Sequence, residues 1–147
     1  MEVTVSNLTK QNMLDVVKKV DAFFDSEQRW TKGSFGRVIN KPIPSYMVGS
    51  LGRCGCDDDL SCCLIGAIYF VEPVNYQLIH QVEDLFFYAL EVKYRSVFDF
   101  NDSERTKFTD IKSLIVRVLN GLQQEIDDEN KNKASDQGSG NEASITK

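Results

Sequence analysis

The amino-acid sequence predicts a mainly α-helical protein, a small four-helix bundle-like domain with a long irregular loop between its first two helices. Two patterns lead to this prediction. Four segments repeat apolar residues every three or four positions, as one face of an amphipathic helix does. The segment between the first two helices lacks that repeat over more than 30 residues. The composition agrees with one globular domain, because 41% of the 147 residues are hydrophobic and 27% are charged.

The first two helices are predicted from apolar spacing and from helix-ending residues. The first is expected at residues 9–25, where the apolar stripe consists of Met13, Val16, Val17, Val20, Phe23 and Phe24. The second is expected to open with Asp59 as N-cap and to end before Pro73. Its residues are apolar on nearly every side, which predicts a central, buried helix. Within it, Gly66 and Ala67 would let a neighbouring backbone approach closely.

The last two helices follow the same reasoning. The third is expected at residues 75–93. The fourth is expected to start with Thr109 as N-cap and Asp110 in its first turn, where a negative charge suits the helix dipole. Between these helices, Val97–Phe100 is a candidate for a short extended piece. No internal repeat is visible.

The end of the chain differs in composition from the rest. Residues 127–147 contain a single large apolar side chain, so we expect a disordered acidic and polar tail after a single domain at 1–126. The longest uncharged apolar run, residues 60–71, has 12 residues, whereas a membrane-spanning helix needs about 20. The first residues lack the features of a signal peptide. We therefore expect a cytoplasmic protein that does not enter a membrane.

The predicted loop, residues 28–56, is basic and rich in glycine. It holds five basic residues and no acidic one, so the rest of the chain carries a net charge of −10 against the overall −5. Cationic residues interleaved with glycine and aromatic rings are typical of sites for phosphate, single-stranded nucleic acid or an acidic protein surface. Alternatively, the loop folds back on the acidic helices of its own domain. The candidate binding residues are Arg29, Trp30, Lys32, Gly33, Phe35 and Arg37.

Four cysteines lie within ten residues in the pattern C-x-C-x5-C-C. Cys54, Cys56, Cys62 and Cys63 are the candidate metal ligands. A structural zinc site generally uses paired C-x2-4-C units, and this pattern contains none. The alternative is that Cys62 and Cys63 are small buried hydrophobic residues. We expect no metal and no cofactor.

The candidate catalytic residues are Cys63, Asn101 and Asp102. Cys63, His80 and Asn101 follow the chain order of papain-like thiol enzymes, and a cysteine in the first turn of a helix has a lowered pKa. Against this chemistry, residues 57–59 are all acidic and disfavour a thiolate, and His80 lies on a carboxylate-bearing helix face. The pair Asn101 and Asp102 could serve as acid and base, but Asn-Asp-Ser is also typical of turns and helix caps.

Three short motifs can be considered together. They are W-x-x-G at Trp30, C-x-x-G-A-[LI] at Cys63, and [FW]-N-D-x-x-x-T at Phe100. In this order they resemble an uncharacterised family of small bacterial and phage domains, over about residues 10–122. The resemblance implies a compact, mainly helical domain, and it implies no activity. The residues that recur in it are Trp30, Gly33, Cys63, Gly66, Asn101 and Asp102. His80 is not part of the pattern.

These observations lead to three hypotheses of function. The first is a non-catalytic protein-interaction or regulatory domain, whose protein partner engages the basic loop or the acidic helical face. The second is a small thiol-dependent enzyme or ligand-binding domain centred on Cys63 and Asn101–Asp102. The third is nucleic-acid or nucleotide binding through residues 28–56, which the overall acidity disfavours. A pocket where Trp30, Cys63 and Asn101 converge would be the first place to look for a ligand.

Overall fold

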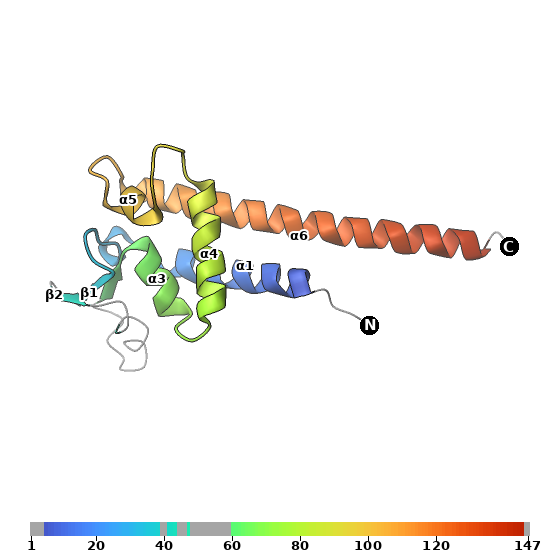
Figure 1. Cartoon of the computed structure of the whole chain (residues 1–147), viewed down its shortest axis with the longest axis horizontal. Helices are drawn as coiled ribbons and strands as arrows, with labels where there is room; N and C mark the ends of the chain where they lie inside the picture. The colour runs from blue at the N-terminus through green and yellow to red at the C-terminus, as the bar shows by residue number, and fades with distance from the viewer. Residues whose placement is uncertain (1–4, 39–40, 44–46, 48–59, 146–147) are drawn as a thin grey trace.

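The computed structural model describes residues 5–38, 41–43, 47 and 60–145, and it confirms the mainly helical fold (Figure 1). The elements in chain order are α1 (Val5–Phe23), a 3-10 turn (Glu27–Arg29), β1 (Gly36–Val38), β2 (Lys41–Ile43), β3 (Leu60–Cys62), α3 (Leu64–Val71), α4 (Tyr76–Ala89), α5 (Val97–Asp102) and α6 (Phe108–Ile145). Helices α1 and α6 run antiparallel beside each other, while α4 crosses them steeply.

The hydrophobic core forms where α1, α3, α4 and α6 meet. As predicted, α3 is central, since five of its eight residues are buried. The predicted apolar stripes of the other helices surround it. Their fully buried members are Val17 and Val20 on α1 and Phe24 directly after it, Ile79, Val82 and Phe86 on α4, and Ile111 and Ile115 on α6.

The predicted start of the second helix was wrong. Instead of following an N-cap at Asp59, which lies outside the described residues, the helix begins at Leu64, and Leu60–Cys62 form strand β3. Leu60 and Cys62 are buried while Ser61 between them is half-buried, which is the two-residue period of a strand. Cys63 is the N-cap, and its Sγ accepts a hydrogen bond from the Gly66 amide at 3.2 Å. A continuous apolar run fits a strand and a helix equally well, so its sequence could not locate this boundary.

A small sheet is formed by strands β1 and β2 of the basic loop together with β3, which follows the loop. Its strand order is β2-β1-β3, and both pairings are antiparallel, with Gly36 of β1 opposite Ile43 and Cys62. Part of the predicted loop is thus regular structure rather than irregular chain. Residues 39–40, 44–46 and 48–59 lie outside the described part.

The expected extended piece at Val97–Phe100 is wrong, because these residues belong to helix α5. Ser96 caps the helix, with its Oγ accepting from the Asp99 amide at 3.1 Å. In return, the Asp99 carboxylate accepts from the backbone amide of Arg95 at 3.0 Å. The spacing Ser-x-x-Asp is a capping signal visible in the sequence, and the alternating apolar residues at 97–100 obscured it.

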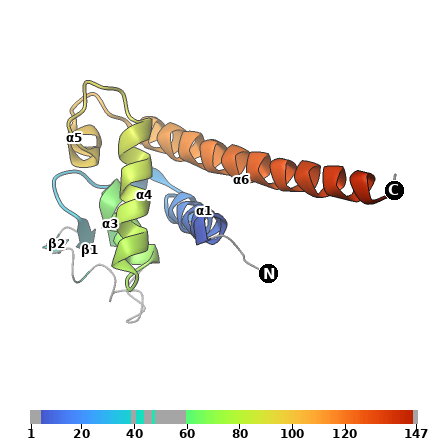
Figure 2. The ribbon, with the colours of Figure 1, turned by 45° about the vertical axis from the view of Figure 1, so that its right-hand side comes forward.

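The last helix is longer than predicted at both ends. It begins at Phe108 rather than after Thr109, and Asp110 accepts from the Lys107 amide at 2.8 Å. It continues to Ile145, through the segment that we expected to be disordered, and extends away from the other helices (Figure 2). The Lys10 ammonium of α1 pairs with Glu125 and Glu129 of this helix. The composition of residues 127–147 alone could not indicate this contact between α1 and α6.

The other helix ends differ by a few residues. Helix α1 starts and ends earlier than the predicted range 9–25. Helix α4 has the expected start, with the Asn75 side chain accepting from the Leu78 amide at 3.1 Å, but it ends at Ala89 rather than near residue 93. None of the helices in the described ranges is both long enough and apolar enough to span a membrane.

Candidate functional site

The three sequence motifs meet at the side chain of Asn101, which is 1% exposed. Its Oδ1 accepts hydrogen bonds from Trp30 Nε1 at 2.8 Å and from the Leu64 amide at 3.0 Å. Its Nδ2 donates to the Thr31 carbonyl at 3.0 Å and to the Asp102 carboxylate at 2.9 Å. We call these five residues the Asn101 cluster. The amide side chain has two donor hydrogens and two acceptor sites, so all four are used.

Glycine at position 66 is required by the backbone that crosses α3. A Cβ atom on Gly66 would lie 1.9 Å from the carbonyl oxygen of Phe35. The same oxygen accepts from the Cys63 amide at 3.0 Å. The Phe35 ring also packs on this region. It lies edge-on to the rings of Tyr69 and Phe98, with 6.0 Å and 5.2 Å between the ring centroids. The predicted close approach at Gly66 is therefore present, and the approaching backbone is that of the basic loop.

The basic loop folds back on its own domain through its cations. Arg29 Nη1 donates to the Leu60 carbonyl at 3.2 Å, and its guanidinium lies 4.9 Å from the centre of the Phe23 ring. Arg37 Nε donates to Ser34 Oγ at 3.3 Å. Arg29 thus joins the loop to α1 and β3, and its Nε lies 4.0 Å from the Asp25 carboxylate, whereas Arg37 contacts a residue of the loop itself.

Lys32 and Gly33 join the same loop to the end of α5. Lys32 Nζ donates to the Ser103 carbonyl at 2.7 Å and lies 5.2 Å from the Trp30 ring centre. The Gly33 amide donates to the Asp102 carboxylate at 2.9 Å. Gly33 has a φ of 80°, in the left-handed region that favours glycine. All six candidate binding residues of the loop thus contact residues of their own domain.

The candidate thiol site lacks the features of a catalytic cysteine. Cys63 is 1% exposed, and burial raises its pKa from the ordinary 9.0 to about 11. Burial also raises the pKa of Cys62. His80 lies on the exposed side of α4 and pairs with Glu83, with Nδ1 3.6 Å from the carboxylate. A neutral, buried thiol is a poor nucleophile.

The candidate metal ligands are only partly described. Cys62 and Cys63 are buried free thiols, whereas Cys54 and Cys56 lie outside the described residues. Within the ranges that the structure covers, no three His, Cys, Asp or Glu side chains are grouped to hold a metal ion.

We predict that the native Cys62 and Cys63 thiols react slowly with a disulfide reagent. In a chain carrying Cys54→Ser and Cys56→Ser, modification at pH 8 should be at least about 100-fold slower in the folded than in the urea-unfolded protein. The reason is the raised pKa of Cys63, about 11 instead of 9.0. At a pH below both of these values, it lowers the fraction of thiolate about 100-fold. The measurement is the absorbance of the released thiol. Rapid native modification of Cys63 would instead support the thiol-enzyme hypothesis.

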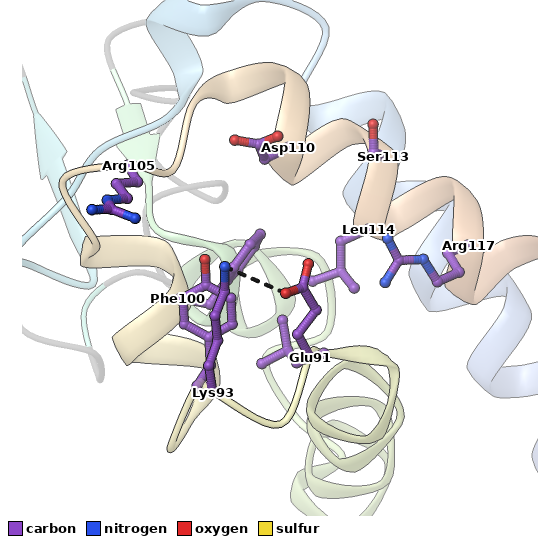
Figure 3. A pocket seen from close by; sticks show the side chains of 10 residues that line it. Glu91, Lys93, Phe100, Arg105, Asp110, Ser113, Leu114 and Arg117 are labelled. Carbon is purple, nitrogen blue, oxygen red and sulfur yellow. Dashed lines mark ion pairs between the residues drawn. The ribbon is translucent and has the colours of Figure 1, made fainter.

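A cleft with a volume of about 230 Å³ lies between the segment after α4, helix α5 and the first turns of α6 (Figure 3). We call it the basic cleft. Its charged lining residues are Glu91, Lys93, Arg105, Asp110 and Arg117. None of the six candidate residues of the loop lines it. Of the charged lining residues only Asp110 was singled out from the sequence, as the acidic residue in the first turn of the last helix.

The outward face of α4 combines aromatic and acidic side chains. We define the α4 face as Tyr76, His80, Glu83, Asp84, Phe87 and Tyr88, which helical spacing places on one side. A notch of about 160 Å³ lies beside it, lined by Glu83, Asp84, Phe87 and Phe98 among others. The sequence predicted a carboxylate-bearing helix face around His80, but it did not identify the exposed aromatic residues on that face. Their signal was the presence of large rings outside the apolar stripe of the helix.

The chain matches no protein-family model, and no curated protein or solved structure shows significant similarity to it. The resemblance to small bacterial and phage domains therefore stays a prediction. The structure adds a physical link among its motifs, since Trp30, Cys63–Leu64 and Asn101 contact one another or share neighbours.

Proposed function

We propose that this protein is a non-catalytic interaction domain whose protein partner binds the α4 face. The observation that carries the proposal is the exposure of three aromatic side chains on one helix. Tyr88 is 79% exposed, Tyr76 62% and Phe87 41%. Aromatic side chains are costly to leave in water, and tyrosine is among the residues that contribute most to protein interfaces. Such a surface is typical of a binding site.

The charge of the α4 face indicates a basic partner. In the described part of the chain, Asp84 forms no ion pair, and Glu83 pairs only with the exposed His80. Tyr69 lies near Glu83, and burial together with that carboxylate raises the tyrosine pKa. The face therefore carries unneutralised negative charge beside its rings.

The residues that line the notch beside Phe87 indicate which kind of side chain the partner contributes. Its rings, Phe87 and Phe98, are each 41% exposed, and Glu83 and Asp84 also line it. A lysine or arginine side chain fits this combination, since its aliphatic stem packs on rings while its charged end pairs with a carboxylate. The proposed partner is therefore a basic segment with large apolar residues.

Other observations count against the thiol-enzyme hypothesis and the nucleic-acid hypothesis. Burial of the Cys63 thiol opposes thiol catalysis. Arg29, Lys32 and Arg37 donate hydrogen bonds to groups of their own domain, so fewer of the loop's donor hydrogens are available to phosphates. The acidic α4 face also repels a nucleic-acid backbone.

The test is a selection of binding peptides from a display library of random 16-residue sequences, with the full chain as bait. We expect the selected peptides to be enriched in Lys or Arg together with large apolar residues. Tyr88→Ala and Asp84→Lys should each weaken their binding at least tenfold, about 1.4 kcal/mol, measured by isothermal titration calorimetry. The matched control is Asp127→Lys on α6, which makes the same charge change away from the notch lining.

Two results would contradict this proposal. One is the selection of acidic peptides. The other is binding that the control weakens as much as Asp84→Lys does, since that would reflect net charge rather than the α4 face. All three substituted side chains are exposed, so circular dichroism should show an unchanged fold.

A further inference from the structure

The notch beside the α4 face presents aromatic rings that are already held in place. Its lining includes Phe87 of α4 and Phe98 of α5, each 41% exposed, together with the buried side chains of Ile65 and Val97. The Phe98 ring packs edge-on against the ring of Phe35, with 5.2 Å between ring centroids. This contact restrains the Phe98 ring and leaves part of it accessible. A restrained ring loses little side-chain entropy when a ligand packs on it.

The two carboxylates of the notch differ in their surroundings. The Glu83 side chain is 25% exposed, and its carboxylate lies 3.6 Å from Nδ1 of His80. Asp84 is exposed and forms no ion pair in the described part of the chain. Among the described residues that line the notch, none is a lysine, arginine or histidine. The lining thus combines two carboxylates with accessible rings and contains no cation.

We infer, on the basis of the proposed function, that the notch binds an arginine side chain of the partner in preference to a lysine. A guanidinium group is planar, stacks on aromatic rings and presents a fork of N–H donors that matches a carboxylate. It is also more weakly hydrated than an ammonium group, so it loses less when it leaves water for a surface of rings. A lysine ammonium pairs with a carboxylate as a point charge. Accessible rings next to the unpaired Asp84 therefore favour arginine.

The test compares two small probes of equal charge, Nα-acetyl-L-arginine amide and Nα-acetyl-L-lysine amide. Each is titrated into the ¹⁵N-labelled full chain at constant ionic strength, and the backbone amide shifts are followed by NMR. We expect the arginine probe to give saturable shifts at Asp84, Phe87 and Phe98. For so small a ligand, its dissociation constant should be of the order of 10 mM. The lysine probe should bind at least threefold more weakly.

Two substitutions identify the groups that recognise the guanidinium. Phe98→Leu keeps an apolar side chain but removes a ring, so it should weaken binding of the arginine probe at least threefold and reduce its advantage over the lysine probe. Asp84→Asn should weaken binding of both probes at least threefold, because both lose an ion pair. Asp84 is exposed, so this variant should keep its fold.

The matched control for the loss of a ring is Tyr76→Leu. Tyr76 is 62% exposed and belongs to the α4 face, but it does not line the notch. The substitution should change the binding of either probe by less than twofold. An effect as large as that of Phe98→Leu would contradict the assignment of the arginine site to the notch.

Three further results would overturn the preference for arginine. They are equal affinity for the two probes, shifts at the notch that do not saturate with the arginine probe, and an arginine preference that Phe98→Leu leaves unchanged. The proposed function would still stand if the selected basic peptides bind and Asp84→Lys weakens them. Selection of acidic peptides would instead overturn the proposed function, and the arginine site with it.

Discussion

Replacing Gly66 by Ala is expected to destabilise the protein by at least about 3 kcal/mol, at the upper end of the usual cost of overpacking a core. The added Cβ would lie 1.9 Å from the carbonyl oxygen of Phe35, which is a backbone atom and cannot turn aside as a side chain would. Moving that carbonyl also breaks its hydrogen bond with the Cys63 amide. The measurement is urea-induced unfolding followed by circular dichroism.

Gly121→Ala is the matched control for this substitution. Gly121 also lies in a helix, α6, but a Cβ atom there would meet nothing within 4 Å. Alanine is favoured over glycine in a helix interior by about 1 kcal/mol, so the control should be stabilising. If Gly66→Ala unfolded at the same urea concentration as wild type, the close contact between α3 and Phe35 would be wrong.

Asn101→Ala is expected to cost at least about 3 kcal/mol of unfolding free energy. The substitution leaves two donors, Trp30 Nε1 and the Leu64 amide, and the Thr31 carbonyl without their partner. Each unsatisfied buried group costs about 1–3 kcal/mol. The expected loss is a large fraction of the 5–15 kcal/mol by which domains are stable.

A double-mutant cycle with Trp30→Phe tests the cause of that loss. Phenylalanine has no indole N–H, so Asn101→Ala should cost less in the Trp30→Phe background. The expected difference is about 1 kcal/mol, the usual coupling of residues in one hydrogen-bond network. Strictly additive effects would show that the bond between Trp30 and Asn101 contributes nothing.

The helices that could be predicted from the sequence are those with one clear apolar face. Helices α1, α4 and the first half of α6 have polar residues opposite the stripe, so the three- and four-residue spacing was unambiguous. At Leu60–Cys62 and Val97–Phe100 the spacing was ambiguous, because the apolar residues there fit both the helix period and the two-residue period of a strand. These two segments were assigned to the wrong structure for that reason.

The α4 face and the basic cleft depend on information that a sequence pattern lacks. Phe87 and Tyr88 are recognisable as unusual only once the inward face of α4 is known. Arg105 and Arg117 are twelve positions apart, and both line one cleft together with residues that follow α4. The motif residues were easier to identify, since Trp30, Gly66 and Asn101 belong to the three short motifs that carry the resemblance.

The members of the Asn101 cluster lie far apart along the chain, which affects when the cluster forms during folding. Asn101 bonds to a backbone amide 37 positions away and to a side chain 71 positions away. Closing such long chain segments costs entropy before any of the bonds can form. We therefore expect the cluster to assemble late in folding, after the local turns of the helices. A substitution in it then accelerates unfolding while leaving the folding rate nearly unchanged, so that the cluster determines the lifetime of the native state.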